Sequence, residues 1–352
     1  MSVRLGEEVQ ALSWAVELSP AIPRIHVVAG VLEDAAGRVL ITQRPAGKSL
    51  AGSWEFPGGK LAPGEERLAG LARELEEELG IRVRPHAARP LIRYLHRTPE
   101  LEIELDAWRV LARDGEPRGL EQQAIAWRAP ETLLDIGLLP ADAAIVTAIR
   151  LPSMCAVSPP RAAAGEEAYL DALEGVALAG QAGLICLRRP DLDAHALLEL
   201  AAGAACRVEG TGARLLLHGD PAVLGPALAA PPPALAARLQ GAVAGLHVPG
   251  RYLGALRARP VPETFWFGVS CHDAGQLEAA HALRADYAFL GPVRATASHP
   301  GEPGIGWKAF AALVAELPLP AYAIGGLGAG DLETAWAAGA QGIAAIRGLW
   351  PG

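Results

Sequence analysis

A segment rich in carboxylates, residues 59–81, constrains this chain more than any other. Glu74, Glu77 and Glu78 are spaced i, i+3 and i+4, so they share one face of a predicted helix, and Gly80 predicts where that helix ends. Most glutamate-rich helices are solvated surface. Here the carboxylates would repel one another unless a cation lay between them, and ligands that are all oxygen favour Mg²⁺ or Mn²⁺. The segment therefore predicts a metal-binding helix.

These carboxylates belong to a longer pattern of fixed spacing. It reads Gly59, five residues, Glu65, seven residues, Arg73-Glu74-Leu75, one residue, Glu77-Glu78, one residue and Gly80-Ile81. The pattern resembles the Nudix box at every defined position, and the resemblance implies a Nudix hydrolase. It also implies that the metal is held by Glu74, Glu77, Glu78 and the backbone carbonyl of Gly58 or Gly59, with Arg73 in the catalytic group. We expect Glu65 to reach the metal through water or to pair with Arg73.

In this family a further carboxylate usually comes from a later loop. The best match is residues 119–122, Gly-Leu-Glu-Gln, which makes Glu121 the candidate for an additional metal ligand or a general base. A solvated loop carboxylate is the alternative interpretation of Glu121.

The residues before the box narrow the substrate. Residues 41–45, Ile-Thr-Gln-Arg-Pro, and 54–59, Trp-Glu-Phe-Pro-Gly-Gly, resemble the MutT-type 8-oxo-dGTP diphosphatases. The resemblance implies substrate binding by Arg44, Glu55, Phe56, Pro57, Gly58, Gly59 and Asp142. Arginine suits a phosphate because its donors form a fork. Asp142 falls where the family places an amide or acid facing the purine edge, although the bacterial type carries Asn there and a helix N-cap is the alternative.

Composition excludes several classes of partner. The net charge is −8 and no basic patch of the kind that duplex DNA demands is present, so we expect a nucleotide ligand and no nucleic-acid polymer. Glutamates interrupt any apolar run near the N-terminus, and the longest uncharged stretch, residues 221–237, contains five prolines. We therefore expect no signal peptide and no membrane span. The four cysteines are widely spaced, which favours reduced thiols in the cytoplasm.

The 352 residues show two different patterns of predicted strands and helices. After an N-terminal extension, residues 1–22, residues 23–150 mix strands and helices in the order of an α+β Nudix sandwich. They include a hairpin around residues 34–37, a helix at 65–79 and a closing helix at 140–150. Residues 154–352 alternate eight apolar strand candidates with Ala- and Leu-rich helices, which predicts a (β/α)8 TIM-type barrel. The linker between the two is four residues long, so we expect few contacts to cross it.

The second half resembles thiamine phosphate synthase and its relative TenI, a thiazole tautomerase. The residues that carry this likeness are 268–272, 290–293, 296–300 and 323–326. The resemblance implies that Gly325 and Gly326 present amide N–H groups to a phosphate, that Arg188 remains from a cationic clamp, and that His272 matches the proton-transferring histidine of TenI. A tight turn and a structural histidine are the alternatives.

The chain departs from the synthase at the residues that bind diphosphate and Mg²⁺. The family's Gln and Lys of the clamp are Cys186 and Pro190, and its Asn-Asp pair is His218-Gly219, with Asp220 one place late. The second metal aspartate is Tyr252, and the lysine after the Thr-rich loop is His299. We therefore expect a barrel that has lost synthase chemistry.

Together these patterns predict Mg²⁺-dependent hydrolysis of oxidised purine nucleoside triphosphates, 8-oxo-dGTP first, in nucleotide-pool sanitation for DNA replication and repair. One alternative is hydrolysis of a thiamine-pathway diphosphate. In that case the barrel is a regulator that binds a phosphorylated metabolite, or a thiazole tautomerase. A purely structural barrel is the third interpretation.

Overall fold

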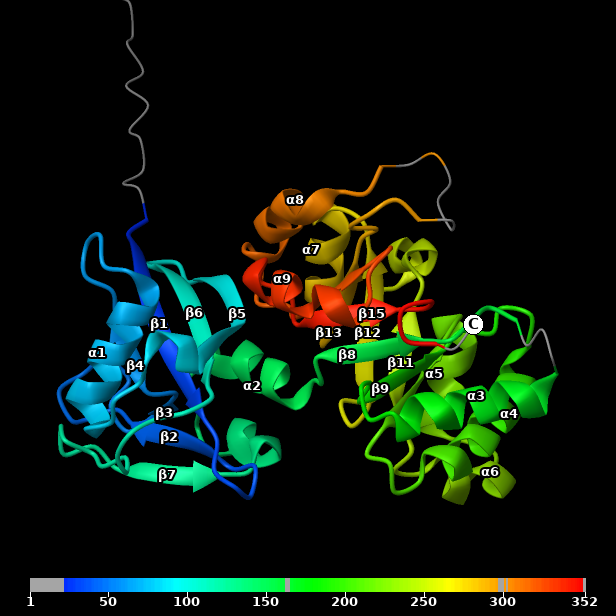
Figure 1. Cartoon of the computed structure of the whole chain (residues 1–352), viewed down its shortest axis with the longest axis horizontal. Helices are drawn as coiled ribbons and strands as arrows, with labels where there is room; N and C mark the ends of the chain where they lie inside the picture. Colours follow the sequence, from blue (N-terminus) through cyan, green and yellow to red (C-terminus); the bar gives the residue numbers. More distant parts are fainter. Residues whose placement is uncertain (1–21, 162–164, 297–300, 302, 351–352) are drawn as a thin grey trace, which may run out of the picture.

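The structure is a computed structural model that describes residues 22–161, 165–296, 301 and 303–350. The predicted extension therefore lies almost entirely outside the described residues, and so does most of the Thr-rich loop, including His299. In Figure 1 the first half of the chain, in blue to cyan, forms a mixed α and β unit, and the second half, in green to red, forms a barrel.

The first unit is built on two sheets. A four-stranded sheet has the order β4-β1-β6-β5, and a three-stranded sheet has the order β3-β2-β7. The strands are β1 (Arg24–Leu32), β2 (Val39–Gln43), β3 (Trp54–Glu55), β4 (Gly58–Lys60), β5 (Ala88–Arg97), β6 (Glu102–Val110) and β7 (Ile125–Arg128). Helix α1 (Arg67–Leu79) packs Leu71, Leu75 and Leu79 into one apolar cluster, and α2 (Ala143–Arg150) packs Ile145 and Val146 into another. The α+β sandwich is thus confirmed.

The expected hairpin is only partly right. The turn at residues 34–37 forms, with the Asp34 carboxylate accepting from the N–H groups of Ala36 and Arg38. A single antiparallel bridge, Glu33 to Val39, follows it. The two strands then diverge, because β1 pairs with β4 and β6 while β2 pairs with β3 and β7. The turn residues correctly predicted where the chain changes direction, but they did not predict which strands pair with β1 and β2.

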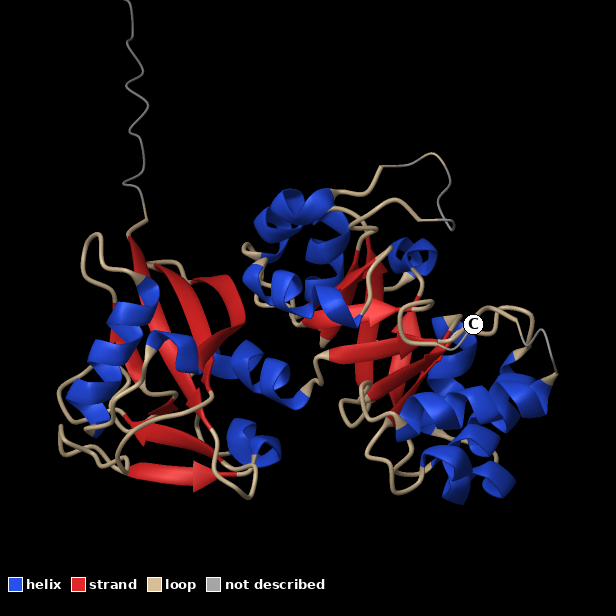
Figure 2. Ribbon diagram, viewed as in Figure 1, coloured by secondary structure: helices blue, strands red, loops and turns tan. Residues whose placement is uncertain are grey.

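The second unit is a closed barrel of eight parallel strands in the order β10-β11-β12-β13-β14-β15-β8-β9. The strands are β8 (Met154–Val157), β9 (Leu184–Leu187), β10 (Arg214–His218), β11 (Val243–Val248), β12 (Trp266–Cys271), β13 (Tyr287–Leu290), β14 (Ala321–Ile324) and β15 (Gly342–Ala345). Figure 2 shows the helices arranged around them. These are α3 (Glu166–Leu178), α4 (Ala194–Val208), α5 (Pro221–Ala229), α6 (Pro233–Leu239), α7 (Ala274–Ala282), α8 (Gly306–Val314) and α9 (Leu332–Ala337). Each predicted strand of the TIM-type barrel is confirmed.

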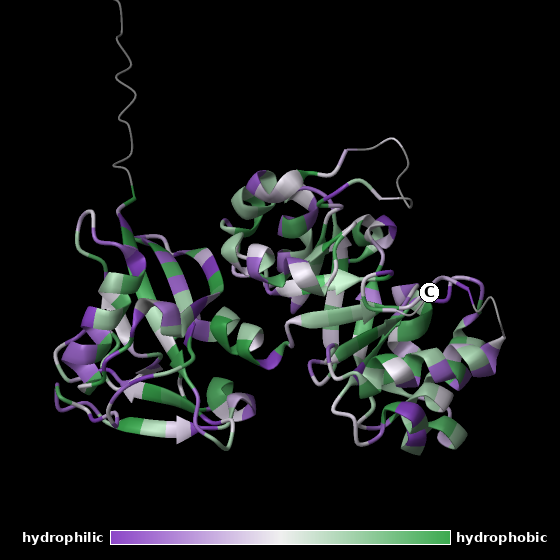
Figure 3. Cartoon of the chain, viewed as in Figure 1, coloured by the Kyte–Doolittle hydropathy of each residue, from purple (hydrophilic) through white to green (hydrophobic). Residues whose placement is uncertain are grey.

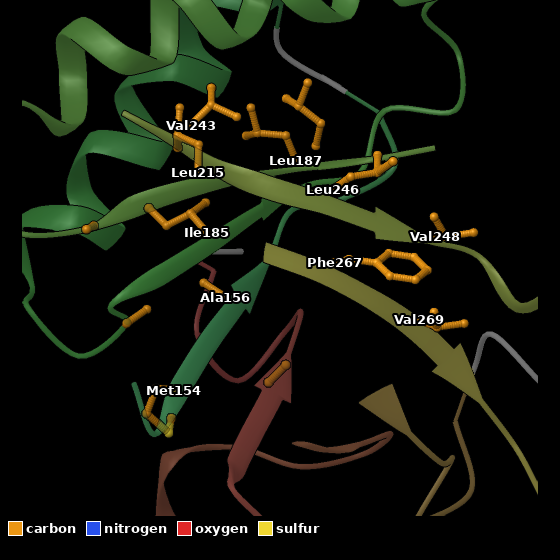
Figure 4. Packing of buried hydrophobic residues seen from close by; sticks show 14 of the residues in the cluster. Met154, Ala156, Ile185, Leu187, Leu215, Val243, Leu246, Val248, Phe267 and Val269 are labelled. Atoms are coloured by element: carbon orange, nitrogen blue, oxygen red, sulfur yellow. The ribbon is translucent and has the colours of Figure 1, made fainter. Parts of the chain in front are cut away.

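Side chains of the barrel strands alternate between two buried layers. Figure 4 shows the outer layer, in which Ile185, Leu215 and Phe267 belong to the cluster beneath the helices. Their neighbours Leu184, Leu216 and Tyr287 belong to a separate inner cluster. Because both faces are buried, the strands are apolar along their length, as their colouring in Figure 3 shows.

Contacts across the linker are more numerous than the sequence led us to expect. Arg97 pairs with Glu316 at 2.7 Å, and the guanidinium of Arg89 lies 4.0 Å above the ring of Trp336. Leu151 of the linker is itself part of the barrel's inner cluster. A short linker holds two units close together, so their facing surfaces pack. Among the described residues, no helix is long and apolar enough to span a membrane.

Candidate active site and barrel pocket

Helix α1 presents the acidic face that the spacing predicted. Its first turn is capped by the Glu66 side chain, which accepts from the Ala69 N–H, and its last turn closes on Gly80 at φ 68°. A positive φ is adopted at least cost by glycine, which explains why the helix ends there.

Arg73 holds most of this acidic face together. Its guanidinium bonds both oxygens of Glu65, at 2.8 and 2.9 Å, and reaches Glu74 at 2.8 Å and Glu77 at 3.1 Å. The hydrogen bonds from Arg73 lower the pKa of Glu65 to about 2. Of the two roles considered for Glu65, the structure shows the pairing with Arg73.

Gly58 and Gly59 let β4 pass very close to its neighbours. A Cβ on Gly58 would lie 2.1 Å from the carbonyl oxygen of Val28, and one on Gly59 would lie 2.3 Å from a carboxylate oxygen of Glu74. Gly58 also has φ 147°. The paired glycines thus bring backbone and carboxylate of the predicted metal site into direct proximity.

Glu78 is the carboxylate of α1 whose pKa is shifted most. It is half-buried and accepts a 3.1 Å hydrogen bond from the Gly58 N–H. Burial raises the pKa of Glu78 to about 7, against the effect of that bond. The negative charges of Glu55 and Glu121 add to the rise. Three carboxylates from α1, β3 and the 119–123 loop therefore act on one another electrostatically, which favours a cation among them.

Two residues that sequence reasoning missed organise the loop carrying Glu121. Lys48 pairs with the Glu121 carboxylate at 2.9 Å. The buried Gln123 accepts from the Glu121 N–H at 2.8 Å and donates to the Glu78 carbonyl at 3.0 Å. Gln123 thereby ties the loop to the end of α1. The only signal in the sequence was its position two residues after the candidate acid.

Arg44 and Glu55 form the other charged pair of the site, at 2.5 Å across β2 and β3. The Arg44 guanidinium also donates to the carbonyl of Ser49, which ties down the loop that follows β2. Burial raises the pKa of Glu55, and Arg44 opposes that shift. Arg44 is therefore held in place by Glu55, which was predicted to bind substrate with it, and by the Ser49 carbonyl.

Asp142 is buried beside the same motif. It is 4% exposed and accepts a 3.1 Å hydrogen bond from the N–H of Phe56, which is also buried, as is Pro57. Its side chain makes no capping bond to α2, so the N-cap alternative does not describe it. Burial raises the pKa of Asp142 to about 7, against the hydrogen bond from Phe56. Near neutral pH this carboxyl is therefore part protonated and, when protonated, has one donor and one acceptor, as asparagine has.

A cavity of about 1190 Å³ opens at the carboxyl ends of the barrel strands. It contains Arg188, His272, Gly325 and Gly326, all four of the residues predicted for a barrel site. Three arginines line it, Arg188, Arg251 and Arg347, and its lining among the described residues includes no carboxylate. The cavity is thus suited to an anion.

Gly325 and Gly326 adopt φ values of 104° and 68° at the end of β14. A Cβ on Gly325 would lie 2.6 Å from Pro292. His272 has its Nδ1 2.5 Å from the carbonyl of Gly291, which orients the ring at the edge of the cavity. Both the phosphate role and the turn role of the glycines agree with this geometry.

Two further histidines lie at the cavity: His218 lines it, and His247, which was not considered from the sequence, stacks on His218. His247 is fully buried, with its ring nitrogens 2.8 Å from the Ser270 hydroxyl and 3.3 Å from the Tyr287 hydroxyl. Its ring stacks on His218 at 5.5 Å. Burial lowers the pKa of His218 to about 4, with Arg188 adding to the effect. Burial also lowers the pKa of His247, so both rings are neutral near pH 7.

Comparisons with known proteins agree with this division. The profile of the NUDIX domain matches residues 28–148, and that of thiamine monophosphate synthase matches residues 154–349. CTP pyrophosphohydrolase of Escherichia coli is 39% identical over 124 residues, which is 35% of this chain and 90% of that protein. An 8-oxo-dGTP diphosphatase of Haemophilus influenzae is 38% identical over 116 residues, 33% of this chain and 83% of that protein.

The barrel has its own relative. A Geobacter sulfurreducens protein assigned provisionally as a thiamine-phosphate synthase is 37% identical over 189 residues, which is 53% of this chain and 81% of that protein. The chain belongs to the Nudix family through its first half and to the thiamine monophosphate synthase family through its second. Its first half is a Nudix pyrophosphohydrolase.

The donor set of the Nudix half fits a divalent cation, which Nudix hydrolases generally use. Glutamate oxygens and the close backbone at Gly58-Gly59 are hard ligands, and the crowding around Glu78 is relieved by positive charge. Among the described residues, no three Asp, Glu, His or Cys side chains lie close enough together to hold a metal ion. Arg73 engages Glu74 and Glu77, and Lys48 engages Glu121. These cations balance the charge that a metal would otherwise balance.

In the barrel, three residues at or next to positions where the resemblance places metal or diphosphate ligands of the synthase have other contacts. Asp220 caps α5 by accepting from the Ala222 N–H, so it serves the helix. Tyr252 lies beneath the guanidinium of Arg251, and Cys186 is fully buried in the inner cluster. Asp220, Tyr252 and Cys186 are all absent from the lining of the cavity.

Replacing Glu78 with glutamine should lower kcat by at least about 100-fold at saturating Mg²⁺, because the change removes a charged metal ligand but keeps the shape. The matched control is Glu76→Gln, on the same helix, since Glu76 is exposed and pairs with Arg82 at 3.0 Å. Steady-state hydrolysis of a nucleoside triphosphate measures both. Near-normal turnover in Glu78→Gln contradicts the assignment.

The pKa of Asp142 makes a second prediction, on stability. Because the folded-state pKa is raised from 3.8 to about 7, ionising this carboxyl weakens the fold, so stability should fall as pH rises from about 4 to about 7. Asp142→Asn should remove this part of the decline. The difference in free energy of unfolding between Asp142→Asn and the wild type should then be more favourable to the variant at pH 8 than at pH 4, by on the order of 3 kcal/mol. Urea unfolding at both pH values measures it. An equal difference at both pH values contradicts the buried, proton-binding carboxyl.

Proposed function

We propose that the Nudix half hydrolyses oxidised purine nucleoside triphosphates in a Mg²⁺-dependent reaction, with 8-oxo-dGTP as the preferred substrate. One water is added, a phosphoanhydride bond breaks, and a nucleoside monophosphate and diphosphate are released. This activity would serve nucleotide-pool sanitation in DNA replication and repair. The observation that carries the proposal is Asp142, buried against the Phe56 N–H in the motif shared with 8-oxo-dGTP diphosphatases.

Base recognition follows from the state of that carboxyl. One oxygen of Asp142 accepts from Phe56, and we propose that the other oxygen meets the edge of the base. A protonated carboxyl has the donor and acceptor of the asparagine that the bacterial type carries. This supports the same role for Asp142 despite the different residue. Trp54 and Phe56 come from the same short segment, in which Phe56 is part of the apolar core and Trp54 packs against that core.

Phosphate binding and chemistry follow from the charged residues. Arg44, held by Glu55, provides a fork of donors for the phosphate chain. Glu74, Glu77, Glu78 and the backbone at Gly59 would hold the cation, with Glu121 as a further ligand or as the base for the attacking water. A bound Mg²⁺ would neutralise phosphate charge and lower the pKa of water. Arg73 keeps the ligands of α1 in place.

CTP is a second candidate substrate, because a relative at 39% identity is named CTP pyrophosphohydrolase. A cytosine ring is smaller than an oxidised purine and presents a different edge to Asp142. Direct competition between the nucleotides separates the two candidates.

We also propose that the barrel no longer makes thiamine phosphate but still binds a phosphorylated metabolite. Its cavity has arginine and glycine residues suited to a phosphate at Gly325-Gly326. The positions of the family's metal ligands hold Gly219 and Tyr252, so the displacement of diphosphate lacks its cation. A tautomerase activity dependent on His272 needs a base and no metal.

The substrate proposal is tested by kcat/KM for 8-oxo-dGTP, dGTP, CTP and thiamine diphosphate, with identification of the released phosphate species. We expect 8-oxo-dGTP to be preferred. Asp142→Ala should erode this preference more than it slows turnover, and Asp142→Asn should retain it, because base contacts discriminate while the metal site does the chemistry. Equal efficiency on 8-oxo-dGTP and dGTP, or higher efficiency on CTP or thiamine diphosphate, overturns the proposal.

The barrel proposal is tested in a strain that lacks thiamine phosphate synthase. The full chain should fail to restore growth without thiamine, whereas an active synthase expressed from the same vector restores it. The protein level is checked by immunoblot. Growth supported by this chain would refute the loss of synthase activity.

A further inference from the structure

Helix α2 is shared between the two halves of the chain. In Figure 1 it lies between the sheet of the Nudix half and the barrel. Its residues Ile145, Val146 and Ala148 are fully buried in the Nudix core. Leu151, directly after the helix, is buried in the inner cluster of the barrel. The two ends of this short segment are therefore fixed by different domains.

The barrel caps the end of α2 through Gln341. The side-chain amide of this residue, 5% exposed, donates to the carbonyls of Ala148 at 3.0 Å and Leu151 at 2.9 Å. The last carbonyls of a helix have no partner within it, so these bonds satisfy groups that are otherwise orphaned. The Tyr322 hydroxyl makes a further bond of 2.6 Å to the carbonyl of Pro152. Both donors come from the amino-terminal ends of barrel strands or just before them.

The other end of α2 carries the residue proposed to read the base. Asp142 immediately precedes the helix and accepts from the Phe56 N–H. An eight-residue helix rises only about 12 Å and behaves as a rigid rod. A displacement at its C-terminal end is therefore transmitted to Asp142, whose bond to Phe56 depends on that position.

We propose that Gln341 and Tyr322 of the barrel are positioning residues for Asp142, acting through α2, so that the barrel helps to set the base specificity of the hydrolase. The substrate side of this inference rests on the proposed function. It gives the barrel a role in the hydrolase that requires no chemistry in its own cavity. Gln341 suits this role because, among the described residues, its side-chain amide bonds only the two carbonyls at the end of α2.

The first test compares full-length variants in the ratio of kcat/KM for 8-oxo-dGTP over dGTP. Gln341→Met keeps the size of the side chain and removes both donors, and should lower the ratio by roughly fivefold. The matched control, Arg97→Ala, breaks the interdomain pair with Glu316 without touching α2, and should leave the ratio unchanged. On an Asp142→Ala background, Gln341→Met should have no further effect. An equal loss on both backgrounds, or an equal loss in Arg97→Ala, overturns the proposal.

The second test does not depend on the substrate. Hydrogen exchange of the Phe56 amide, which Asp142 protects, should be faster in Gln341→Met than in the wild type and unchanged in Arg97→Ala. If the wild type shows no preference for 8-oxo-dGTP, the proposed function fails, while accelerated exchange at Phe56 still supports the positioning role. Unchanged exchange at Phe56 refutes that role whatever the substrate.

A milder variant covers the case in which Gln341→Met does not fold. Tyr322→Phe removes only the hydroxyl that bonds Pro152 and keeps the buried ring. It should change the nucleotide ratio and the Phe56 exchange in the same direction, by less. A folded Tyr322→Phe protein with wild-type values in both measurements overturns the proposal.

Discussion

The arrangement of the candidate site in the Nudix half depends on balancing the negative charge of several glutamates that lie close together. Glu55, Glu78 and Glu121 influence one another, and Glu74 and Glu77 lie on the same helix as Glu78. The loop after β2 and helix α1 offset this charge through the ion pairs of Arg44, Lys48 and Arg73. The close passage of Gly58 and Gly59 past Val28 and Glu74 is part of the same arrangement. In the proposed function a cation would take the place of Lys48 and Arg73 beside the glutamates. A polyphosphate would take the place of Glu55 beside Arg44.

The barrel has the architecture of the thiamine monophosphate synthase family, and the proposed change concerns its chemistry. Eight parallel strands close around an apolar inner cluster, and Gly325 and Gly326 follow β14 at the edge of the cavity. Arg188, Arg251, Arg347 and two histidines, His218 and His272, line the cavity. Architecture can be kept while chemistry changes, because the strands are specified by apolar alternation, whereas a reaction depends on a few side chains at their ends.

The two halves are joined by more than a linker. Leu151 completes the inner cluster of the barrel, and Gln341 and Tyr322 bind the backbone just before the first barrel strand. The same inner cluster includes Val157, Phe289 and Ala344, which line the cavity. Asp142, α2, the linker and the inner cluster that lines the barrel cavity thus form a continuous series of contacts.

The sequence by itself determined both folds, the acidic helix with its end at Gly80 and the eight barrel strands, because these follow from local spacing and apolar periodicity. It did not determine the strand partners of β1 and β2, the part played by Lys48 and Gln123, or the contacts that cross the linker. Nor could it decide the state of Asp142, whose pKa is raised by burial against the opposing hydrogen bond from Phe56, 86 residues away along the chain. Only the tertiary structure settles such features, since burial and charge balance depend on groups that are distant in sequence and adjacent in space.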